Sequence, residues 1–481
     1  MITMGELKLN VVGDVYDLVV VGAGPAGMAA AVTGRAQGLS VLVVDEGPGP
    51  GGQVFRAIMA PPMGRRPVGQ REVLGPDYWR GEVLAQAFNA SWADYVRECS
   101  VWYLDAGLQL GLSSGGKSRV IGARRVILAT GAIERPMPVK GWTLPGVMTV
   151  GAAQTLLKSS GIVARGRVVL AGAGPLLWLL AAQYLAAGAK PALILETVPR
   201  GQRWAAARHA GGFLRSAYAR KGLSLLARVR RAVRVVSGAS GIEIEEGEAL
   251  RLRWDGADWM EADHVLLHQG VVPNVNLAAA AGCGLAWNEA QACWQPETDA
   301  LGNTSVAGIA VAGDGAGIGG AELAEGRGRI AALAAAEALG KIGAEARARM
   351  VAEERARMRP YERGRAFLDA LYRPARAMRM GAPEAMACRC EEVSVARVRE
   401  VAGELGVQGP NQLKAFLRCG MGPCQGRFCG LTVGEIIADV RGVSPAEVGY
   451  YRLRPPVKPI TVAELASMAR SEADLRAVVR S

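Results

Sequence analysis

Cysteine thiols are crowded near one end of this 481-residue sequence. Of its 8 cysteines, five fall in the stretches CRC, at 388–390, and CGMGPCQGRFC, at 419–429, whereas Cys99, Cys283 and Cys293 are scattered. Thiolates bind zinc or iron–sulfur clusters, and they also carry out redox chemistry. The crowding therefore predicts one local metal or redox site.

The spacing of these cysteines favours iron and sulfur over zinc. A [2Fe-2S] cluster takes four thiolates, two on each iron. Structural zinc usually takes paired C-x2-C knuckles, which the C-x-C and C-x4-C spacings do not supply. The CRC pair precedes a predicted helix capped by Ser394, and Cys424 and Cys429 precede another, so both pairs gain the positive potential of helix N-termini. Glycines leave room around the sulfurs and expose N–H donors to them, at Gly420, Gly422, Gly426 and Gly430.

A second chemical motif, YDLVVVGAGPAGMAAAVTGRAQGLSVLVVDEG, predicts a dinucleotide site near the start of the sequence. It combines a buried strand, a glycine turn, a helix and a second strand that ends in an acid. Gly22 permits the turn, Gly24 lets a pyrophosphate approach the backbone, and Gly27 lets the helix pack close to its strand. We expect Asp45 to hold the adenosine ribose hydroxyls, with Glu46 as the neighbouring alternative.

Three further motifs favour FAD as this dinucleotide. GPGGQ follows the second strand, VILATGA predicts a strand ending at a Thr-Gly pair, and GIAVAGDGAG predicts another ending at Gly313 and Asp314. Together they resemble the FAD domain of the two-dinucleotide-fold, glutathione-reductase-like flavoproteins. The resemblance implies that Gly313 and Asp314 meet the flavin's pyrophosphate and ribityl chain, and that the following helix is directed at the isoalloxazine. The expected cofactor-binding residues are Gly22, Gly24, Pro25, Ala26, Gly27, Asp45, Glu46, Gly52, Gln53, Thr130, Gly131, Gly313 and Asp314.

The stretch GRVVLAGAGPLLWLLAAQYLAAGAKPALILET repeats the nucleotide-fold pattern with a flaw. Leu177 stands where the third glycine belongs, so we expect the helix to be pushed from its strand. The fold should persist, with NAD(P)H binding weak, lost or replaced by another nucleotide, although Glu196 could still hold a ribose. A membrane helix over the uncharged residues 168–189 is rejected, because a strand and glycine turn open the stretch and Gln183 and Tyr184 interrupt it.

Length, charge and the first residues limit the number of domains, the kinds of partner and the cellular location. The length predicts several domains, and the net charge of +12 raises the question of nucleic acid. Arginines alternate with glutamates in ERARMRPYERGRAF, so a solvated helical face is preferred, with an acidic partner protein as the other alternative. The first residues lack the pattern of a signal peptide, so we expect a cytoplasmic protein without structural disulfides. His264 and His268 fall on a predicted strand and are interpreted as structural.

The chain as a whole resembles a known family through GPAGMAAA, GGQVFRA, LGPDYWRG, VILATGAIERPMPVKGWTLPGVMTVGAAQ and RCGMGPCQGRFCG. These stretches resemble the larger FAD/[2Fe-2S] subunit of the opine oxidase, D-hydroxyproline dehydrogenase and hydrogen cyanide synthase family. The resemblance implies a smaller FAD-containing partner similar to glycine or sarcosine oxidase. It also implies a small ferredoxin-like chain in some members, FMN at the contact between the two large subunits, and at most peripheral membrane contact.

The cysteine spacing itself resembles the bacterioferritin-associated-ferredoxin-like (BFD-like) domain appended to anaerobic glycerol-3-phosphate dehydrogenase. Matched residue by residue, that resemblance gives Cys388, Cys390, Cys424 and Cys429 as ligands of a [2Fe-2S] cluster. It leaves Cys419 as a spare.

The expected fold class is α/β, a two-dinucleotide-binding-domain flavoprotein with a small helical BFD-like domain. The expected boundaries are 1–155 and 276–350 for the FAD-binding domain, 156–275 for an NAD(P)-binding-like domain, 351–380 for a basic helical linker, 381–450 for the [2Fe-2S] domain and 451–481 for a docking tail.

The expected function is an electron relay. A secondary amine or amino acid, of the opine, D-hydroxyproline, proline or glycine type, is oxidised on the partner's flavin, and electrons pass through this chain's FAD and cluster to a quinone or carrier. This chain then needs no general base, and no catalytic residue is expected in it. Two alternatives are a stand-alone NAD(P)H-dependent reductase and a binding or assembly module with vacant sites.

Overall fold

The first sheet is built around the N-terminal glycine turn. The computed structural model describes residues 8–59 and 69–468, so residues 469–481 of the expected tail lie outside the described part. Seven strands follow the order β3-β2-β1-β6-β5-β4, with β19 paired to β6. The central strands are parallel and apolar, as expected for strands covered on both faces. The strands are β1 (Val15–Val21), β2 (Val41–Val44), β3 (Asp94–Val96), β4 (Ser100–Leu104), β5 (Gln109–Ser114), β6 (Lys117–Leu128) and β19 (Ile309–Val311).

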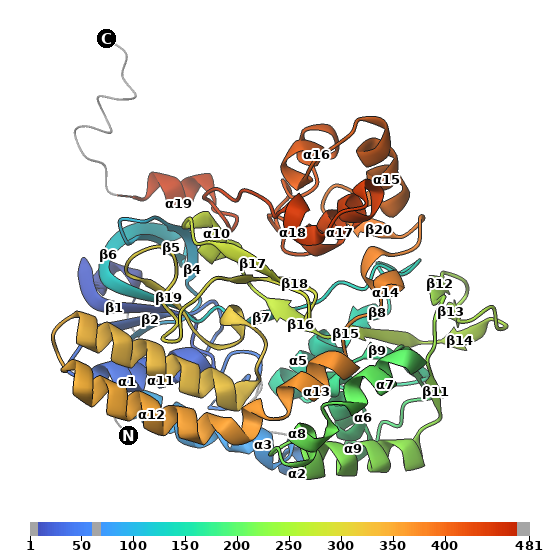
Figure 1. The fold of residues 1–481 in the computed structure, drawn as a ribbon, viewed down its shortest axis with the longest axis horizontal. Helices are drawn as coiled ribbons and strands as arrows, with labels where there is room; N and C mark the ends of the chain where they lie inside the picture. The colour runs from blue at the N-terminus through green and yellow to red at the C-terminus, as the bar shows by residue number, and fades with distance from the viewer. Residues whose placement is uncertain (1–7, 60–68, 469–481) are drawn as a thin grey trace.

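Helices from both ends of the first fold meet on one face of this sheet. In Figure 1, α1 (Pro25–Ala36) lies beside α11 (Ala321–Ala338). Their approach is close, because a Cβ at Gly328 would lie 2.1 Å from the carbonyl oxygen of Ala26. Residues near 310–340 thus return to complete the fold begun by the first 130. The other elements here are η1 (Leu9–Val11), α2 (Gln70–Leu74), α3 (Pro76–Trp79), α4 (Gly81–Ala90), α10 (Asn276–Ala280), β17 (Leu285–Asn288), β18 (Cys293–Pro296) and η2 (Gly313–Ala316).

The second sheet repeats the parallel arrangement over a continuous stretch of chain. Its order is β11-β10-β9-β15-β8, and a three-stranded antiparallel sheet, β12-β13-β14, lies at its edge. The uncharged residues 168–189 form a strand, a turn and a helix, as predicted. None of the helices in residues 8–59 and 69–468 combines the length and apolarity that a bilayer crossing requires. The elements are β8 (Val147–Thr149), α5 (Val150–Ser160), β9 (Val168–Ala173), α6 (Pro175–Ala186), β10 (Leu193–Glu196), α7 (Arg200–Ala207), α8 (Ala210–Leu214), α9 (Ala219–Ala232), β11 (Val235–Ser237), β12 (Glu243–Glu245), β13 (Leu250–Arg253), β14 (Met260–Ala262) and β15 (His264–Gln269).

Two short strands join the folds, and three helices connect α11 to the small domain. Antiparallel β7 (Ala132–Glu134) and β16 (Val271–Pro273) form the junction. The segment expected as a basic linker is helical and forms α12 (Ala344–Glu362), α13 (Arg365–Leu371) and α14 (Arg376–Met380). Arg357 of this segment and Arg329 of α11 both pair with Glu354, which is only 7% exposed, so part of the face expected to be solvated packs against α11.

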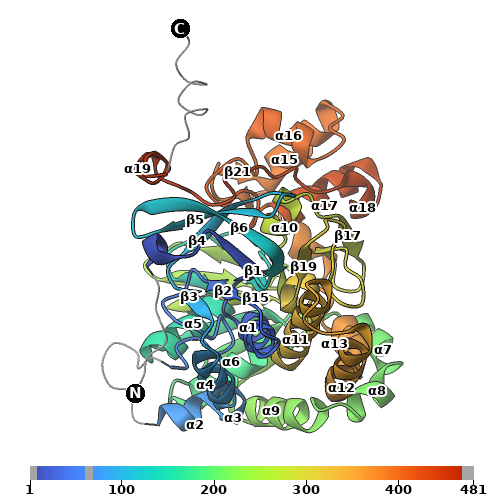
Figure 2. The same cartoon turned by 90° about the vertical axis from the view of Figure 1, so that its left-hand side faces the viewer.

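A small helical domain holds the cysteine-rich segment and sits above the two folds (Figure 1). It has its own apolar core, centred on Val395, Leu413 and Ile436. Beyond it the chain returns to the first sheet, where the Val457 N–H donates to the Trp102 carbonyl at 3.0 Å. Figure 2 shows α19 lying over β5, away from the small domain. The elements are β20 (Met386–Cys388), β21 (Val393–Ser394), α15 (Val395–Glu404), α16 (Pro410–Leu417), α17 (Gly430–Arg441), α18 (Pro445–Val448) and α19 (Val462–Ala466).

The predicted α/β class is confirmed, with two dinucleotide-type folds and a small helical domain after them.

Candidate functional site

The first glycine turn accepts no side chain where it bends. Gly22 has a φ of +108°, and a Cβ there would lie 2.4 Å from the Ala129 carbonyl oxygen. A Cβ at Gly27 would lie 1.7 Å from the Gly22 carbonyl oxygen, so α1 starts as close to β1 as two backbones allow. No capping side chain and no acidic residue occupies the first turn of α1. The positive end of the helix therefore remains available to a phosphate.

Two further predicted motifs lie at the same turn and form a cradle lined by backbone. A Cβ at Gly52 would lie 2.8 Å from the Cα of Gly24, so these two glycines face each other. A Cβ at Gly313 would lie 2.8 Å from the Cβ of Ala26, the second residue of the helix that Pro25 begins. The structure thus brings three separated motifs to the carboxyl edge of one parallel sheet, where nucleotides bind in such folds. These glycines fit the pyrophosphate of FAD.

Asp45 and Glu46 differ in what already binds them. The carboxylate of Asp45 accepts hydrogen bonds at 2.6 Å from the N–H groups of Ala23 and Gly47, and burial raises its pKa. No cation among the described residues forms an ion pair with it. Glu46 is exposed and pairs with Lys458 of the C-terminal segment at 2.7 Å. Asp45 is therefore the better placed of the two for a ribose.

Asp314, Thr130 and Gly131 were expected to lie along the flavin's ribityl chain and isoalloxazine. Backbone groups of nearby loops fix the first two. Asp314 Oδ1 accepts from the N–H groups of Gly319, at 2.8 Å, and Gly320, at 2.9 Å. Thr130 Oγ1 donates at 3.2 Å to a backbone carbonyl beyond β16. Gly131 has a φ of +64° and no atom within 4 Å of the Cβ position, which leaves open space beside it.

Lys158 is a site residue that the sequence reasoning missed. It lies on α5 with 5% of its surface exposed, and its Nζ donates to the Gln53 carbonyl at 3.0 Å and to Gln154 Oε1 at 2.8 Å. Burial, followed by repulsion from Arg56, lowers its pKa to about 7. Val150, Gln154 and Lys158 follow one another at intervals of four, so they lie on one helix face. The sequence signal for this site was therefore the presence of two polar residues on a face that Val150 marks as buried.

The second glycine turn is occupied by a side chain. A Cβ at Gly174 would lie 2.9 Å from the Nε2 of His268, so the imidazole fills the space beside this turn. Nδ1 of His268 lies 2.6 Å from Glu134 Oε1, which fixes the ring there. Leu177 is fully buried in the core under α6, and the fold persists with it, as predicted. His264 and His268 both lie on β15, the strand that the sequence predicted for them.

Glu196, which could have held a second ribose, is already bound. Only 5% of it is exposed, and its Oε2 accepts from Arg203 at 2.5 Å, Arg230 at 3.2 Å and Ser237 at 2.9 Å. Tyr372, at the end of α13, packs beside it, and burial raises the pKa of this phenol to about 12. The residues at the carboxyl edge of the second sheet therefore do not fit a nicotinamide dinucleotide.

The structure brings together all four expected thiol ligands and Cys419 with them. Hydrogen bonds from Cys419 and Cys429 lower the pKa of Cys388 to about 2, and hydrogen bonding with Cys429 lowers that of Cys424 to about 5. The thiol of Cys390 contacts that of Cys424. In the described part of the chain, no group of three or more histidine, cysteine or acidic side chains is arranged so that it could hold a metal ion.

The surroundings of these thiols suit a sulfur cluster. Ser394 caps α15 as predicted, accepting from the Arg397 N–H at 3.2 Å, and Cys429 is the N-cap residue of α17. Tyr451 is buried, with its hydroxyl 3.8 Å from Cys429 Sγ. The donors are all thiols, four of them buried and Cys390 exposed, which is the donor chemistry of a [2Fe-2S] cluster. Their proximity does not by itself separate Cys419 from the other four.

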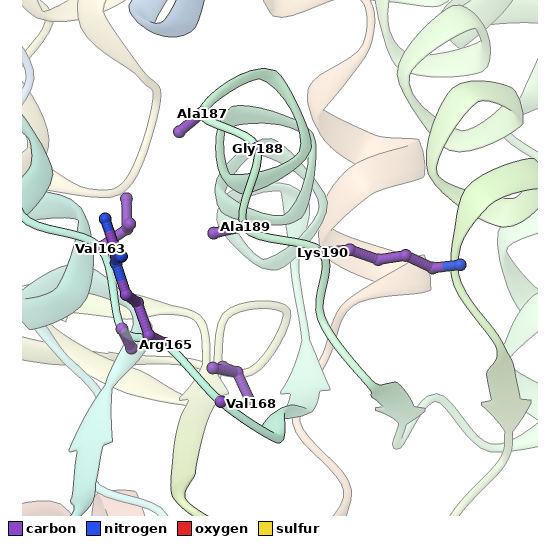
Figure 3. Close-up of a pocket in the computed structure, with 9 residues that line it drawn as sticks. Val163, Arg165, Val168, Ala187, Gly188, Ala189 and Lys190 are labelled. Atoms are coloured by element: carbon purple, nitrogen blue, oxygen red, sulfur yellow. The ribbon is translucent and has the colours of Figure 1, made fainter.

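A cavity of about 340 Å³ lies at the opposite end of the second sheet (Figure 3). It is bordered by 163–166 and Val168, before and at the start of β9, and by 187–190, after α6. Lys190 points away from it (Figure 3). None of the predicted site residues borders it.

Comparison with known proteins places this geometry among flavoproteins. Residues 16–358 match the model of the pyridine nucleotide-disulphide oxidoreductase family, and 387–469 match the sarcosine oxidase A3 domain. The chain is 49% identical over 479 residues to one subunit of the opine oxidase of Agrobacterium tumefaciens, covering 97% of this chain and 94% of that one. It is 31% identical to the hydrogen cyanide synthase subunit HcnB of Pseudomonas aeruginosa, covering 92% and 96%. In fold it is similar to L-proline dehydrogenase from P. horikoshii, with a TM-score of 0.65 at 19% identity, covering 95% and 80%.

Proposed function

Because this chain belongs to the pyridine nucleotide-disulphide oxidoreductase family, and within it groups with opine oxidase subunits, we propose that it is the electron-transferring subunit of a heteromeric dehydrogenase. It is an FAD-dependent oxidoreductase subunit. The complex oxidises a secondary amine or amino acid of the opine, D-hydroxyproline, proline or glycine type. Its partner is a smaller FAD-containing subunit similar to glycine or sarcosine oxidase, joined in some complexes by a small ferredoxin-like chain, with FMN at the subunit contact.

One observation carries the proposal: a single chain holds both a glycine cradle suited to FAD and a group of five thiols suited to a [2Fe-2S] cluster. When bound, FAD accepts electron pairs and releases single electrons, which an iron–sulfur cluster requires. Gly24 and Gly52, whose backbones lie in contact, would present no side chain to the pyrophosphate, and Asp45 would accept from the ribose. Cys388, Cys390, Cys424 and Cys429 hold the cluster, with Cys419 beside them.

Nothing at the second nucleotide fold supports direct reduction by NAD(P)H. His268 fills the space beside Gly174, and Glu196 is bound by two arginines. The test is anaerobic incubation of the purified complex with NADH, NADPH or an opine. We expect the opine to bleach the flavin absorbance and the nicotinamides to leave it unchanged. Bleaching by NADH in this chain purified alone would instead establish the stand-alone reductase.

Single serine substitutions test the ligand set. Each of Cys388→Ser, Cys390→Ser, Cys424→Ser and Cys429→Ser should lose the iron, the acid-labile sulfide and the paramagnetic signal of the reduced cluster. Cys419→Ser is the matched control and should keep all three. Zinc in the wild-type protein would overturn the cluster assignment, and loss of iron in Cys419→Ser would overturn the choice of four.

The variant Tyr451→Phe tests whether the hydroxyl near Cys429 changes the reduction potential of the cluster. Hydrogen bonds to ligand sulfurs tune the reduction potential of iron–sulfur centres. We expect the variant to keep its iron and to have a lower midpoint potential. An unchanged potential would leave Tyr451 a packing residue.

A further inference from the structure

A hollow of about 360 Å³ opens on the small domain directly over the thiols. Cys390 and Cys424 line it, so whatever these sulfurs hold lies close to this surface. Among the 8 cysteines, Cys390 is exposed and the rest are buried. The hollow is lined by Arg389, Cys390, Pro423, Cys424, Arg427, Phe428 and Pro459.

Exposed apolar side chains surround this hollow. Phe428, which lines the hollow, is 45% exposed, and Pro423 and Pro459 in its lining are exposed too; Met421, two residues before Pro423 in the chain, is 47% exposed. Aromatic residues, methionine and arginine are the types enriched at protein interfaces, and clustered exposed apolar residues commonly mark such sites. The surface therefore has the composition of a contact site for another protein.

The charges around the hollow are positive and largely unpaired. Some arginines elsewhere in the described residues pair with acids, as Arg329 does with Glu354. Arg427 has no carboxylate partner within residues 8–59 and 69–468, and the same holds for Arg389, which lies over the Trp142 ring at 5.4 Å. Of the two nearby acids, Glu391 is bound by Arg418 at 3.2 Å, whereas Glu392 is exposed. The balance at the hollow favours an acidic partner.

Resting on the proposed function, we propose that this surface, defined by Arg389, Cys390, Met421, Pro423, Arg427 and Phe428, docks an acidic one-electron carrier protein. Electron-transfer partners meet through small contacts, which need a few apolar anchors and a charged rim that guides the encounter. Here Phe428 and Met421 are the anchors and the arginines are the guide. Cys390 marks the place where an electron leaves the chain by the shortest route, with the carrier reduced by one electron and the thiolate-bound centre oxidised by one.

The test measures binding to the purified complex of an acidic plant-type [2Fe-2S] ferredoxin as the probe. Arg427→Glu should raise the dissociation constant at least tenfold at low ionic strength, and the difference should shrink at about 0.15 M salt, where charges are screened. Phe428→Ala should raise the dissociation rate about tenfold, with little change in the association rate.

The matched control is Arg441→Glu, which makes the same charge change in the same domain. Arg441 lies in the last turn of α17, about 18 Å along the helix from Cys429. It should change the dissociation constant less than twofold. Equal weakening by Arg427→Glu and Arg441→Glu would show that the probe senses only the net charge, and would overturn the proposal.

Two further outcomes separate this proposal from the one it rests on. Loss of the smaller oxidase subunit from Arg427→Glu or Phe428→Ala during purification would assign the surface to the subunit interface and overturn the carrier proposal. Absence of a paramagnetic signal from the reduced wild type would refute the cluster, whereas the binding difference between Arg427→Glu and Arg441→Glu would still decide whether the surface docks an acidic protein.

Discussion

The two nucleotide folds of this chain share a topology and differ in how each glycine turn is filled. In the first, the one described atom within 4 Å of a Cβ at Gly24 is the Cα of Gly52, at 3.8 Å. In the second, the imidazole of His268 stands at 2.9 Å from the corresponding position at Gly174. The first turn is an open cradle, and the second is closed by the protein itself.

The acids at the strand ends repeat the contrast. Among the described residues, Asp45 accepts only from backbone N–H groups, whereas Glu196 is held by Arg203 and Arg230. A carboxylate whose charge is already compensated by two guanidinium groups has little reason to exchange them for ribose hydroxyls. A nucleotide-type fold can therefore keep its strands, turn and helix while its own side chains occupy the groups that would bind a nucleotide.

Gly27→Leu imposes on the first fold the residue that the second carries at Leu177. A Cβ at position 27 would lie 1.7 Å from the Gly22 carbonyl oxygen, so α1 must move away from β1. This displacement should cost at least the ~1–3 kcal/mol of stability that overpacking usually costs. We expect purified Gly27→Leu to retain almost no FAD, measured as flavin absorbance relative to protein. Gly49→Ala, where no atom lies within 4 Å of the Cβ position, is the control and should retain FAD fully. A yellow Gly27→Leu protein would mean that the close approach is not needed.

Asp45→Ala removes the acid of the open site. Hydrogen bonds to charged groups contribute about 1.5–3 kcal/mol, so the dissociation constant of FAD should rise about ten- to a hundredfold. Equilibrium titration of the apoprotein with FAD measures it. Glu46→Ala should leave the FAD affinity unchanged while freeing Lys458. If the two variants behave alike, the assignment of the ribose to Asp45 fails.

Glu196→Gln removes the acid of the closed site. Arg203 and Arg230 then face a neutral amide, and we expect the free energy of unfolding to fall by about 1–2 kcal/mol, since both arginines are partly exposed. FAD content should not change. Chemical denaturation measures the loss against Glu261→Gln, whose exposed pair with Arg167 should matter little. Lower FAD content without a stability loss would contradict the structural role of Glu196.

Lys158→Met tests the place where the two folds meet. The pKa of Lys158 is lowered to about 7 in the folded protein and is near 10.4 in an unfolded chain. Between these values the unfolded state binds more protons, so this lysine makes the free energy of unfolding rise with pH. The Tm of wild type minus that of Lys158→Met should therefore increase by about 2–4 °C from pH 7 to pH 9.

Lys190→Met, at an exposed lysine of the second fold, is the control for this titration and should keep the wild-type pH dependence. The same dependence in Lys158→Met would show that the buried amine does not titrate in this range.

Strand, turn and helix patterns predicted most of the fold, because apolar runs and glycine turns are local signals. The flaw at Leu177 was visible in the sequence, and so was the helix cap at Ser394. The closure of the second turn was not visible, since His268, Glu134 and the residue they cover come from three separate elements. Sequence periodicity says which face of an element is buried and not what lies across from it.

The same limit explains which site residues were missed. Lys158 faces a loop about a hundred residues earlier in the chain, and Tyr451, interpreted as the start of a docking tail, packs into the core of the cysteine-rich domain. The choice between Asp45 and Glu46 also needed the structure, because Lys458 reaches Glu46 from the far end of the sequence. The exposed arginines near Cys390 looked from the sequence like part of a general positive charge.

β19 and α19 return to the first sheet from late in the chain. The first fold is therefore the first to be synthesised but the last to be completed. On the ribosome the second fold, contiguous from β8 to β15, has all its strands before the first fold receives β19 at Ile309–Val311. The side chain of Glu464 reaches Ser113 only when the end of the chain emerges. The nascent first sheet therefore waits with an unpaired edge, which is the kind of exposure that chaperones protect. Cofactor loading there must be a late event, since Gly313 is part of the cradle.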